Sequence, residues 1–207
     1  MWTKSTSMMI LVVSLALYPG RAAWSQMPNA PGGDFQTSAY WAVGYAVNAP
    51  TQLMGFSTVI FSPGLAHWGV YADYKRTLDS PEDGDEYDGS VTPSQAINDF
   101  NDRRTDDESV WTTVNVGIVR VLTGDLAVYA GAGYAREEAY EQYFDDQRDR
   151  GVFGYYWVKD DAGSGNRLNL LAGAWLRATP GVLFQFGAET APRGFTVGAA
   201  LVLPFLR

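Results

Sequence analysis

Residues 167–207 decide the fold, and they read RLNLLAGAWLRATPGVLFQFGAETAPRGFTVGAALVLPFLR. Every second residue from Phe195 to Phe205 is apolar, whereas the residues between them are mostly small. The same alternation runs through 182–189 and 167–177, and turns at 179–181 and 190–194 separate the three runs. A period of two residues indicates β-strands. An apolar face opposite a small or polar face is typical of a strand that spans a membrane in a closed barrel.

The N-terminal 25 residues have the organisation of a secretory signal peptide. Lys4 precedes an apolar run at 8–18, and a small-residue site follows at 23–25. The run is about half of the roughly 20 residues that a membrane-spanning helix needs. We therefore predict a signal peptide at 1–25, a periplasmic lead at 26–36 and a barrel at 37–207.

The composition narrows the function classes. The chain has no cysteine, which excludes disulfides, a thiolate metal site and lipid attachment through cysteine. It carries 15 Lys and Arg against 23 Asp and Glu. Nucleic acid is therefore not expected as a partner, because phosphate contacts need clustered basic residues. The acidic residues are concentrated at 78–108, a segment with eleven carboxylates and only two basic residues, Arg103 and Arg104.

Five further alternating runs precede the final three. They lie at 40–47, 52–61, 67–77, 109–122 and 126–140. The connections after the second, fourth and sixth runs are short, and those after the third and fifth are long, at about 78–108 and 141–166. Outer-membrane barrels alternate short periplasmic turns with longer extracellular loops in this way. The prediction is an all-β, eight-stranded antiparallel up-and-down transmembrane β-barrel with two long extracellular loops.

Three stretches resemble a known family: WGVYADYK at 68–75, YAGAGY at 129–134 and the closing hairpin at 184–205. They are similar to the outer-membrane-protein β-barrel superfamily, the small OmpA/OmpX-type barrels. The resemblance implies a bacterial outer-membrane location, with lipid, lipopolysaccharide and the barrel-assembly machinery as partners. It does not imply a particular function, because this fold hosts many.

The final strand resembles the C-terminal signal that the assembly machinery reads. Its alternating residues are Phe195, Val197, Ala199, Leu201, Leu203 and Phe205. The sequence departs from that signal at its end, since Leu206 and Arg207 follow the terminal aromatic residue.

Inward-pointing polar residues predict a plugged lumen. The candidates are Asp73, Lys75, Arg167, Arg177, Gln185 and Glu189. The interior of an eight-stranded barrel is just wide enough for side chains to fill, and buried polar groups must pair. We expect a network of ion pairs and hydrogen bonds, with a narrow gated channel as the alternative.

Catalysis is not predicted. His67 is the only histidine, and it lies at the periplasmic start of a strand, away from the outer rim. The acids at 106–108 and at Glu137 and Glu138 could in principle share a site as acid and base, but exposed loop carboxylates rarely do so. We keep an outer-membrane enzyme only as an alternative.

The acidic loop is rich in oxygen ligands. Its carboxylates are Asp79, Glu82, Asp83, Asp85, Glu86 and Asp88. Their spacing does not match an EF-hand. We expect a solvated, mobile loop without a dedicated metal site or cofactor. The alternatives are specific calcium binding and loosely bound Ca²⁺ or other divalent cations that bridge the loop to lipopolysaccharide.

A cluster of aromatic residues lies in or beside the second long connection. It consists of Tyr143, Phe144, Phe153, Tyr155, Tyr156 and Trp157. Either the strands continue beyond the membrane as a paired ribbon, which we favour, or these residues form an exposed patch. Such a patch would suit an extracellular protein or glycan.

The sequence favours a structural, adhesive or ligand-binding role through the acidic extracellular loops. One alternative is an outer-membrane enzyme or narrow channel. Another is a secreted lipocalin-like barrel with the faces inverted, which would bind a small apolar ligand, since alternation alone does not say which face is inside. The Gly- and Ala-rich faces argue against that inversion, because they are too small for a solvent-facing surface.

Overall fold

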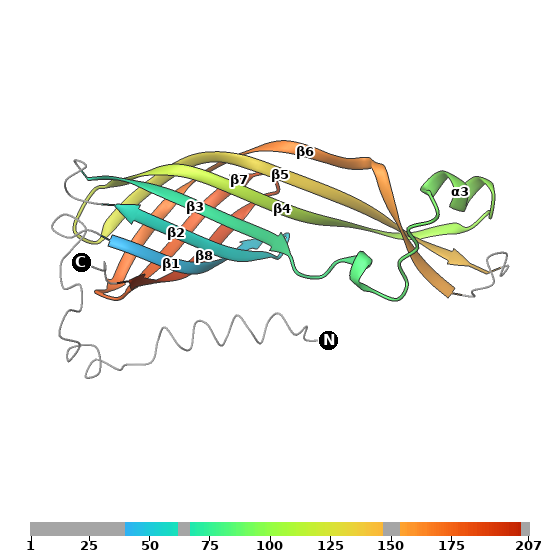
Figure 1. Cartoon of the computed structure of the whole chain (residues 1–207), viewed down its shortest axis with the longest axis horizontal. Helices are drawn as coiled ribbons and strands as arrows, with labels where there is room; N and C mark the ends of the chain where they lie inside the picture. The colour runs from blue at the N-terminus through green and yellow to red at the C-terminus, as the bar shows by residue number, and fades with distance from the viewer. Residues whose placement is uncertain (1–39, 62–66, 147–153, 204–207) are drawn as a thin grey trace.

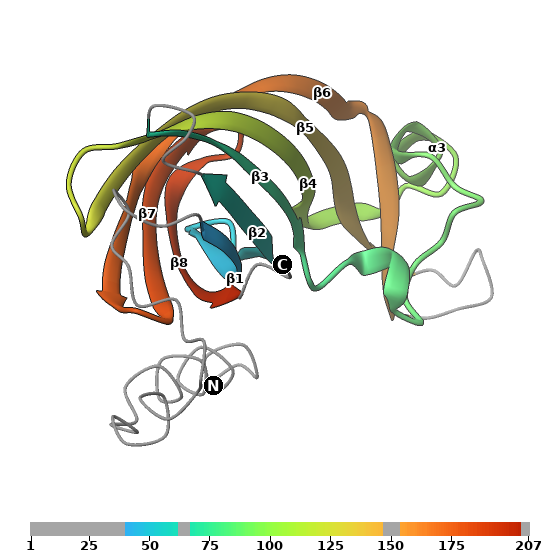
Figure 2. The ribbon, with the colours of Figure 1, turned by 60° about the vertical axis from the view of Figure 1, so that its left-hand side comes forward.

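Eight antiparallel strands pair in chain order, and the last closes on the first (Figures 1 and 2). The structure is a computed structural model, and it describes residues 40–61, 67–146 and 154–203. The strands are β1 (Tyr40–Ala49), β2 (Leu53–Phe61), β3 (Trp68–Thr77), β4 (Arg103–Val121), β5 (Leu126–Asp145), β6 (Gly154–Thr179), β7 (Val182–Thr190) and β8 (Arg193–Leu203). The predicted eight-stranded antiparallel barrel is confirmed. The predicted signal peptide and periplasmic lead, together with Phe153 and Phe205, lie outside the described residues.

The strand faces point as the alternation predicts. Phe56, Leu168 and Phe195 lie on the outside and are 66%, 69% and 73% exposed. The residues next to them along the strands, such as Ser57 and Asn169, are buried in the lumen. The inverted, lipocalin-like arrangement is therefore wrong for this barrel, because its large apolar side chains point outward.

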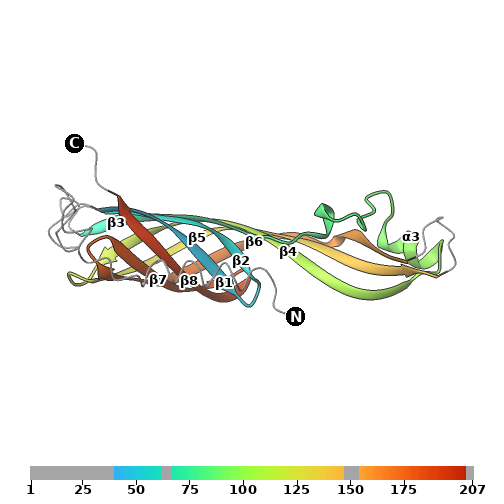
Figure 3. The same ribbon diagram turned by 90° about the horizontal axis from the view of Figure 1, so that it is seen from below.

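Three strands are longer than predicted. β4 begins at Arg103, β5 continues to Asp145 and β6 begins at Gly154. Figures 1 and 3 show these strands continuing well past the ends of β1, β2, β7 and β8. We call the three-stranded extension the ribbon; it comprises 103–109 of β4, 138–145 of β5 and 154–160 of β6. The predicted loop at 141–166 is wrong for most of its length, whereas the paired ribbon that the aromatic cluster favoured is present.

A large bulge separates the ribbon from the barrel on β6. Glu137 of β5 pairs with Gly165, and Ala139 pairs with Asp160, so that 161–164 lie opposite a single residue. The Ser164 hydroxyl holds the bulge closed, since it accepts from the Ala139 N–H at 3.0 Å and donates to the Asp160 carbonyl at 2.7 Å. The bend of β6 in Figure 1 lies at this place. Bulges re-aim a strand in this manner.

The connection between β3 and β4 packs onto the ribbon. It contains a 3-10 turn, η2 (Pro81–Asp83), and a short helix, α3 (Pro93–Asn98), which a capping box between Thr92 and Gln95 begins. Ala96 of the helix is buried against Tyr143, Tyr156 and Val158, with Val91 beside them. The expectation of a wholly solvated loop is therefore wrong, because this segment has a small apolar core of its own. No helix in the part of the chain that the structure describes is long and apolar enough to cross a membrane.

Candidate functional site

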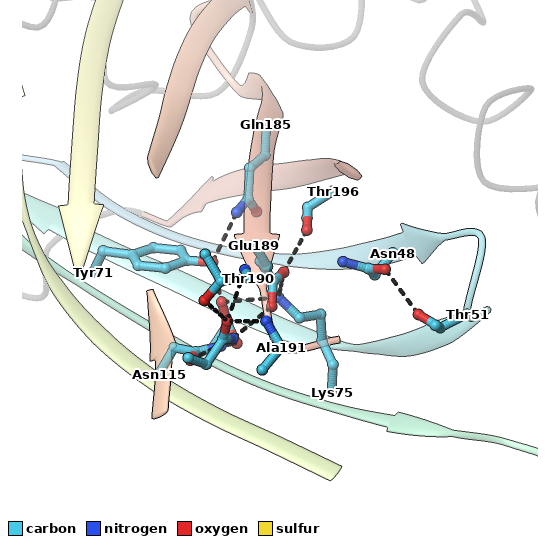
Figure 4. Close-up of polar contacts among 12 residues, drawn as sticks. Asn48, Thr51, Tyr71, Lys75, Asn115, Gln185, Glu189, Thr190, Ala191 and Thr196 are labelled. Atoms are coloured by element: carbon cyan, nitrogen blue, oxygen red, sulfur yellow. Dashed lines mark hydrogen bonds and ion pairs between the residues drawn. The ribbon is translucent and has the colours of Figure 1, made fainter. Parts of the chain in front are cut away.

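Lys75 lies at the centre of a buried polar network in the upper lumen (Figure 4). Its Nζ is 3.1 Å from Oδ2 of Asp73 and forms a second ion pair with Oε1 of Glu189. The side chains of Lys75 and Asp73 are fully buried, and that of Glu189 is 2% exposed. Asp73 and Lys75 stand two residues apart on β3, while β7 brings Glu189 from the other side of the lumen.

Amides and hydroxyls satisfy the remaining oxygens of these acids. Asn115 donates to Oδ1 of Asp73 at 2.8 Å, and Asn169 donates to Oε2 of Glu189 at 2.9 Å. The hydroxyl of Thr196 also donates to Glu189. Gln185 donates to the Tyr71 hydroxyl at 2.8 Å, and that hydroxyl in turn donates to Asp73. A buried ion pair is stable only when its other lone pairs are satisfied in this way.

The structure brings four of the six predicted lumen residues together and excludes two. Asp73, Lys75, Gln185 and Glu189 share the network described above. Arg167 points toward the ribbon base instead, where its 58% exposed side chain pairs with Glu137.

Arg177 lies at the opposite end of the barrel, with its Nε 3.8 Å from Asp125. Placing Arg167 and Arg177 in the network was therefore wrong. The alternation gave the correct inward side at both positions, but it does not give the height of a residue in the lumen.

The sequence predicts Tyr71 and Asn169 as inward neighbours of these candidates, and both join the network. Asn115 and Thr196 lie on predicted inner faces, but sequence reasoning missed their part in the network. Their inward position and hydrogen-bonding capacity were the signal that could have identified them.

Apolar layers cover the network on both sides. Toward the ribbon lie Leu53, Trp111, Ala135 and Ala191, all buried. Toward the short turns lie the stacked rings of Tyr71 and Tyr129, 4.6 Å apart, and the buried Trp175. Below them the core continues with smaller side chains such as Val121 and Leu183. The polar layer is therefore enclosed along the barrel axis.

The ribbon has one covered face and one open face. Tyr143 and Tyr156 lie on the face that α3 covers, with their rings stacked 6.0 Å apart. Because neighbours along a strand point to opposite faces, Phe144, Tyr155 and Trp157 lie on the other side. The Phe144 and Tyr155 rings are 4.8 Å apart, and Tyr155 is 50% exposed. The predicted aromatic cluster is thus divided between a small core and an open aromatic face.

An ion-pair clamp holds η2 against the ribbon. Nζ of Lys159 lies 2.8 Å from Glu138 and 3.2 Å from Glu82. The Tyr140 hydroxyl beside Glu82, together with the bond and charge of Lys159, lowers the pKa of Glu82. The hydrogen bond to Glu138 raises the pKa of Lys159. Trp157 adds backbone contacts to the same loop, since it donates to the Glu86 carbonyl and accepts from the Asp88 N–H, both at 2.8 Å.

The predicted carboxylate sites are spread apart. Glu137 pairs with Arg167, and Glu138 pairs with Arg136 and Lys159, so each of these acids has its own cation. Within residues 40–61, 67–146 and 154–203, no group of three or more His, Asp or Glu side chains is placed to hold a metal ion. Loose Ca²⁺ binding by the acidic loop and the absence of catalysis both stay predictions.

Comparisons with known proteins give similarity to solved structures only. No family model matches the chain, and no curated protein matches it. The attachment invasion locus protein Ail of Yersinia pestis, in complex with the heparin analogue sucrose octasulfate, is 14% identical over 79% of this chain and 94% of its own, with a TM-score of 0.42. Ail in a phospholipid bilayer nanodisc is 16% identical over 83% and 99%, with a TM-score of 0.43. Neisserial surface protein A is 14% identical over 79% and 90%, with a TM-score of 0.28. Identities this low transfer no ligand and no role to this chain.

Proposed function

We propose that this protein is a bacterial outer-membrane barrel that anchors an extracellular binding platform, the ribbon. A continuous apolar belt on the outside of the barrel supports the membrane location. Tyr74, Val114, Tyr134 and Leu168 stand side by side on four strands and are 46–69% exposed. Trp68 lies six residues from Tyr74 on β3, which is about 20 Å along the tilted strand. Exposed aromatic residues therefore lie toward both ends of the belt, as they do in the two girdles of an outer-membrane barrel.

The last strand supports recognition by the assembly machinery. In its described part, Phe195, Val197 and Leu201 point outward and are 73%, 46% and 53% exposed. A row of alternating apolar residues on the closing strand is therefore available before β8 pairs with β1.

The open aromatic face of the ribbon carries the proposed binding function. One side of the ribbon is closed by its own connection through Ala96, Tyr143 and Tyr156, whereas Tyr155 on the other side stays half exposed. A connection that only joined two strands would not need the small apolar core that holds the ribbon in place. Rigid aromatic side chains beside hydrogen-bonding groups are typical of binding surfaces.

Charge and hydrogen-bonding groups narrow the ligand class. Gln142 pairs with both Trp157 and Asp106 in the strand register, so an amide and a carboxylate stand on the aromatic face. The chain carries a net charge of −8, and the β3–β4 connection is its most acidic part. We therefore propose a neutral or cationic glycan or a basic protein segment as the ligand, because a polyanion would be repelled.

A glycan array probed with fluorescent proteoliposomes tests this function. The double variant Phe144→Ser, Tyr155→Ser should bind the array with at least tenfold lower fluorescence than the wild type. Ile97→Ser is the matched control, because Ile97 is also exposed, at 51%, but belongs to α3. A boiling-dependent gel shift in the outer-membrane fraction must accompany each sample. Equal binding by the wild type and the double variant would refute the aromatic face as the binding site.

A further inference from the structure

One backbone edge of the ribbon has no partner strand. β3 pairs with β4 only as far as Arg76 opposite Thr112, while β5 follows β4 to Arg103. Among the described strands, only β5 therefore pairs with residues 103–110. The side chains at 103–107 are all exposed. Unpaired N–H and C=O groups on an open edge are a template for another strand.

The order of charges along this edge is self-complementary. The residues read Arg103, Arg104, Thr105, Asp106, Asp107 and Glu108. Thr105 is the extra residue of the register shift between Arg104 and Asp106, and facing residues must lie on the same face of the sheet. An antiparallel pair of two identical edges therefore has its two-fold axis at Asp106, so that the Asp106 residues of the two copies face one another and Arg103 of each copy faces Glu108 of the other. Arg104 then faces Asp107. Opposite charges directly across a strand pair are stabilising, and the two-fold symmetry makes four such pairs.

The parallel, in-register alignment of the same edge is repulsive. A parallel, in-register pair would set arginine against arginine and acid against acid, which destabilises a strand pair. Two copies in one membrane have their β4 strands running in the same direction, so they cannot form the antiparallel pair. The antiparallel pair needs copies that point at one another from two opposed membranes.

We propose that residues 103–108 of β4 form a homotypic contact through which copies in two apposed membranes pair antiparallel. The proposal rests on the membrane location proposed above but not on the aromatic face. It gives the protein a cell-to-cell or vesicle-to-vesicle adhesive activity whose partner is a second copy of this chain.

Two local features agree with this contact. Burial, together with the neighbouring carboxylates of Asp79 and Asp106, raises the pKa of Glu108, and Arg103 of a second copy would counter this effect. The register of β4 also shifts between Arg104 and Asp106. The extra residue, Thr105, lies beside the two-fold axis, and it places Arg103 and Glu108 on one face of the sheet and Arg104 and Asp107 on the other.

Charge-swapped proteoliposomes test the proposal. Wild-type liposomes at low salt should aggregate, as measured by turbidity, and added salt should disperse them because exposed charges are screened. The variants Arg103→Glu, Arg104→Glu and Asp107→Arg, Glu108→Arg should each aggregate at least tenfold less. A mixture of the two variants should regain aggregation, because each of the four facing pairs again joins opposite charges.

Matched controls separate this contact from net charge and from the proposed function. Arg136→Glu, Arg193→Glu has the same charge change as the first swap and leaves the edge intact, so it should aggregate like the wild type. The aromatic variant Phe144→Ser, Tyr155→Ser should also still aggregate. Dispersed wild-type liposomes that show the heat-modifiable band would overturn the proposal, and so would a failure of the mixed variants to recover. Protein that does not insert into liposomes at all would instead contradict the membrane location.

Discussion

At the scale of single residues, Lys75 is the charge that holds the lumen network together. Replacing it by methionine leaves Asp73 and Glu189 facing one another without a cation. Loss of one partner from a buried ion pair costs about 3–5 kcal/mol, so Lys75→Met should lower the urea midpoint of the gel-shift unfolding transition. Adding Glu189→Gln to that variant should restore part of the loss, because one of the two opposed carboxylates is then neutral.

Arg167→Met is the matched control for this prediction. It removes a cation of similar size whose side chain is 58% exposed, and an exposed pair contributes only roughly 0–1 kcal/mol. Equal midpoints for Lys75→Met and Arg167→Met would show that the lumen network does not stabilise the barrel. The comparison also separates a residue that belongs to the network from one that the sequence prediction wrongly included in it. Position 167 is on the inner face but lies at the height of the ribbon base, above the network. A period of two gives the face of a residue and not its height along the barrel.

At the scale of elements, the β3–β4 connection is a separate small folding unit on the ribbon. Ala96 is its buried contact with Tyr143 and Tyr156. Ala96→Arg should detach α3, because the side chain has no room in that core, and protease cleavage within 91–102 should increase. Ser94→Arg is the control, since Ser94 is exposed on the same helix. The unfolding midpoint of the barrel should not change in either variant. A lower midpoint in Ala96→Arg that accompanies the increased cleavage would contradict a separate folding unit.

The clamp between η2 and the ribbon should open in acid. The pKa of Glu82 is lowered in the folded protein, below the ordinary glutamate value of 4.5. Its stabilising contribution is therefore fully present above that value and is lost as the pH falls through the lowered folded pKa. The pKa of Lys159 is raised, so its contribution persists throughout this range.

Hydrogen exchange at the Trp157 and Asp88 amides measures this opening, once the intrinsic pH dependence of exchange is subtracted. Protection should fall on acidification in the wild type. Glu82→Gln should show weak protection at neutral pH and little further loss in acid. An unchanged pH profile in this variant would mean that another group controls the loop.

The elements also show what the sequence could and could not predict. Alternation is a local signal, and it gave all eight strands and their faces, from Trp41 to Leu203. The ribbon was harder to place, because 161–164 have the Asp, Gly and Ser composition of a loop but form a bulge within β6. The packing of Ala96 on Tyr156 joins segments 60 residues apart, and no local pattern records such a contact.

At the scale of the whole molecule, the barrel and the ribbon are separately packed parts. The barrel is filled from the short turns to the ribbon base by an apolar core, a polar layer and an apolar lid. Nothing in that order of layers requires the ribbon, and the ribbon's own core does not touch the lumen. Variation on the open face or the β4 edge should therefore change binding without changing the fold.

The layered interior predicts that the protein does not conduct ions. Reconstituted in a planar bilayer, the wild type should give no steps above the bare membrane, while a sixteen-stranded porin in the same bilayer provides the positive control. Trp111→Ala thins only the lid, so it should also stay silent, because the network around Lys75 and the rings of Tyr71 and Tyr129 still fill the lumen. The wild type could instead give steady conductance steps, with a cation preference that is higher in Lys75→Met. This result would mean that the ions pass beside Asp73 and Glu189. That result would replace the sealed barrel with the narrow channel that its sequence left as an alternative.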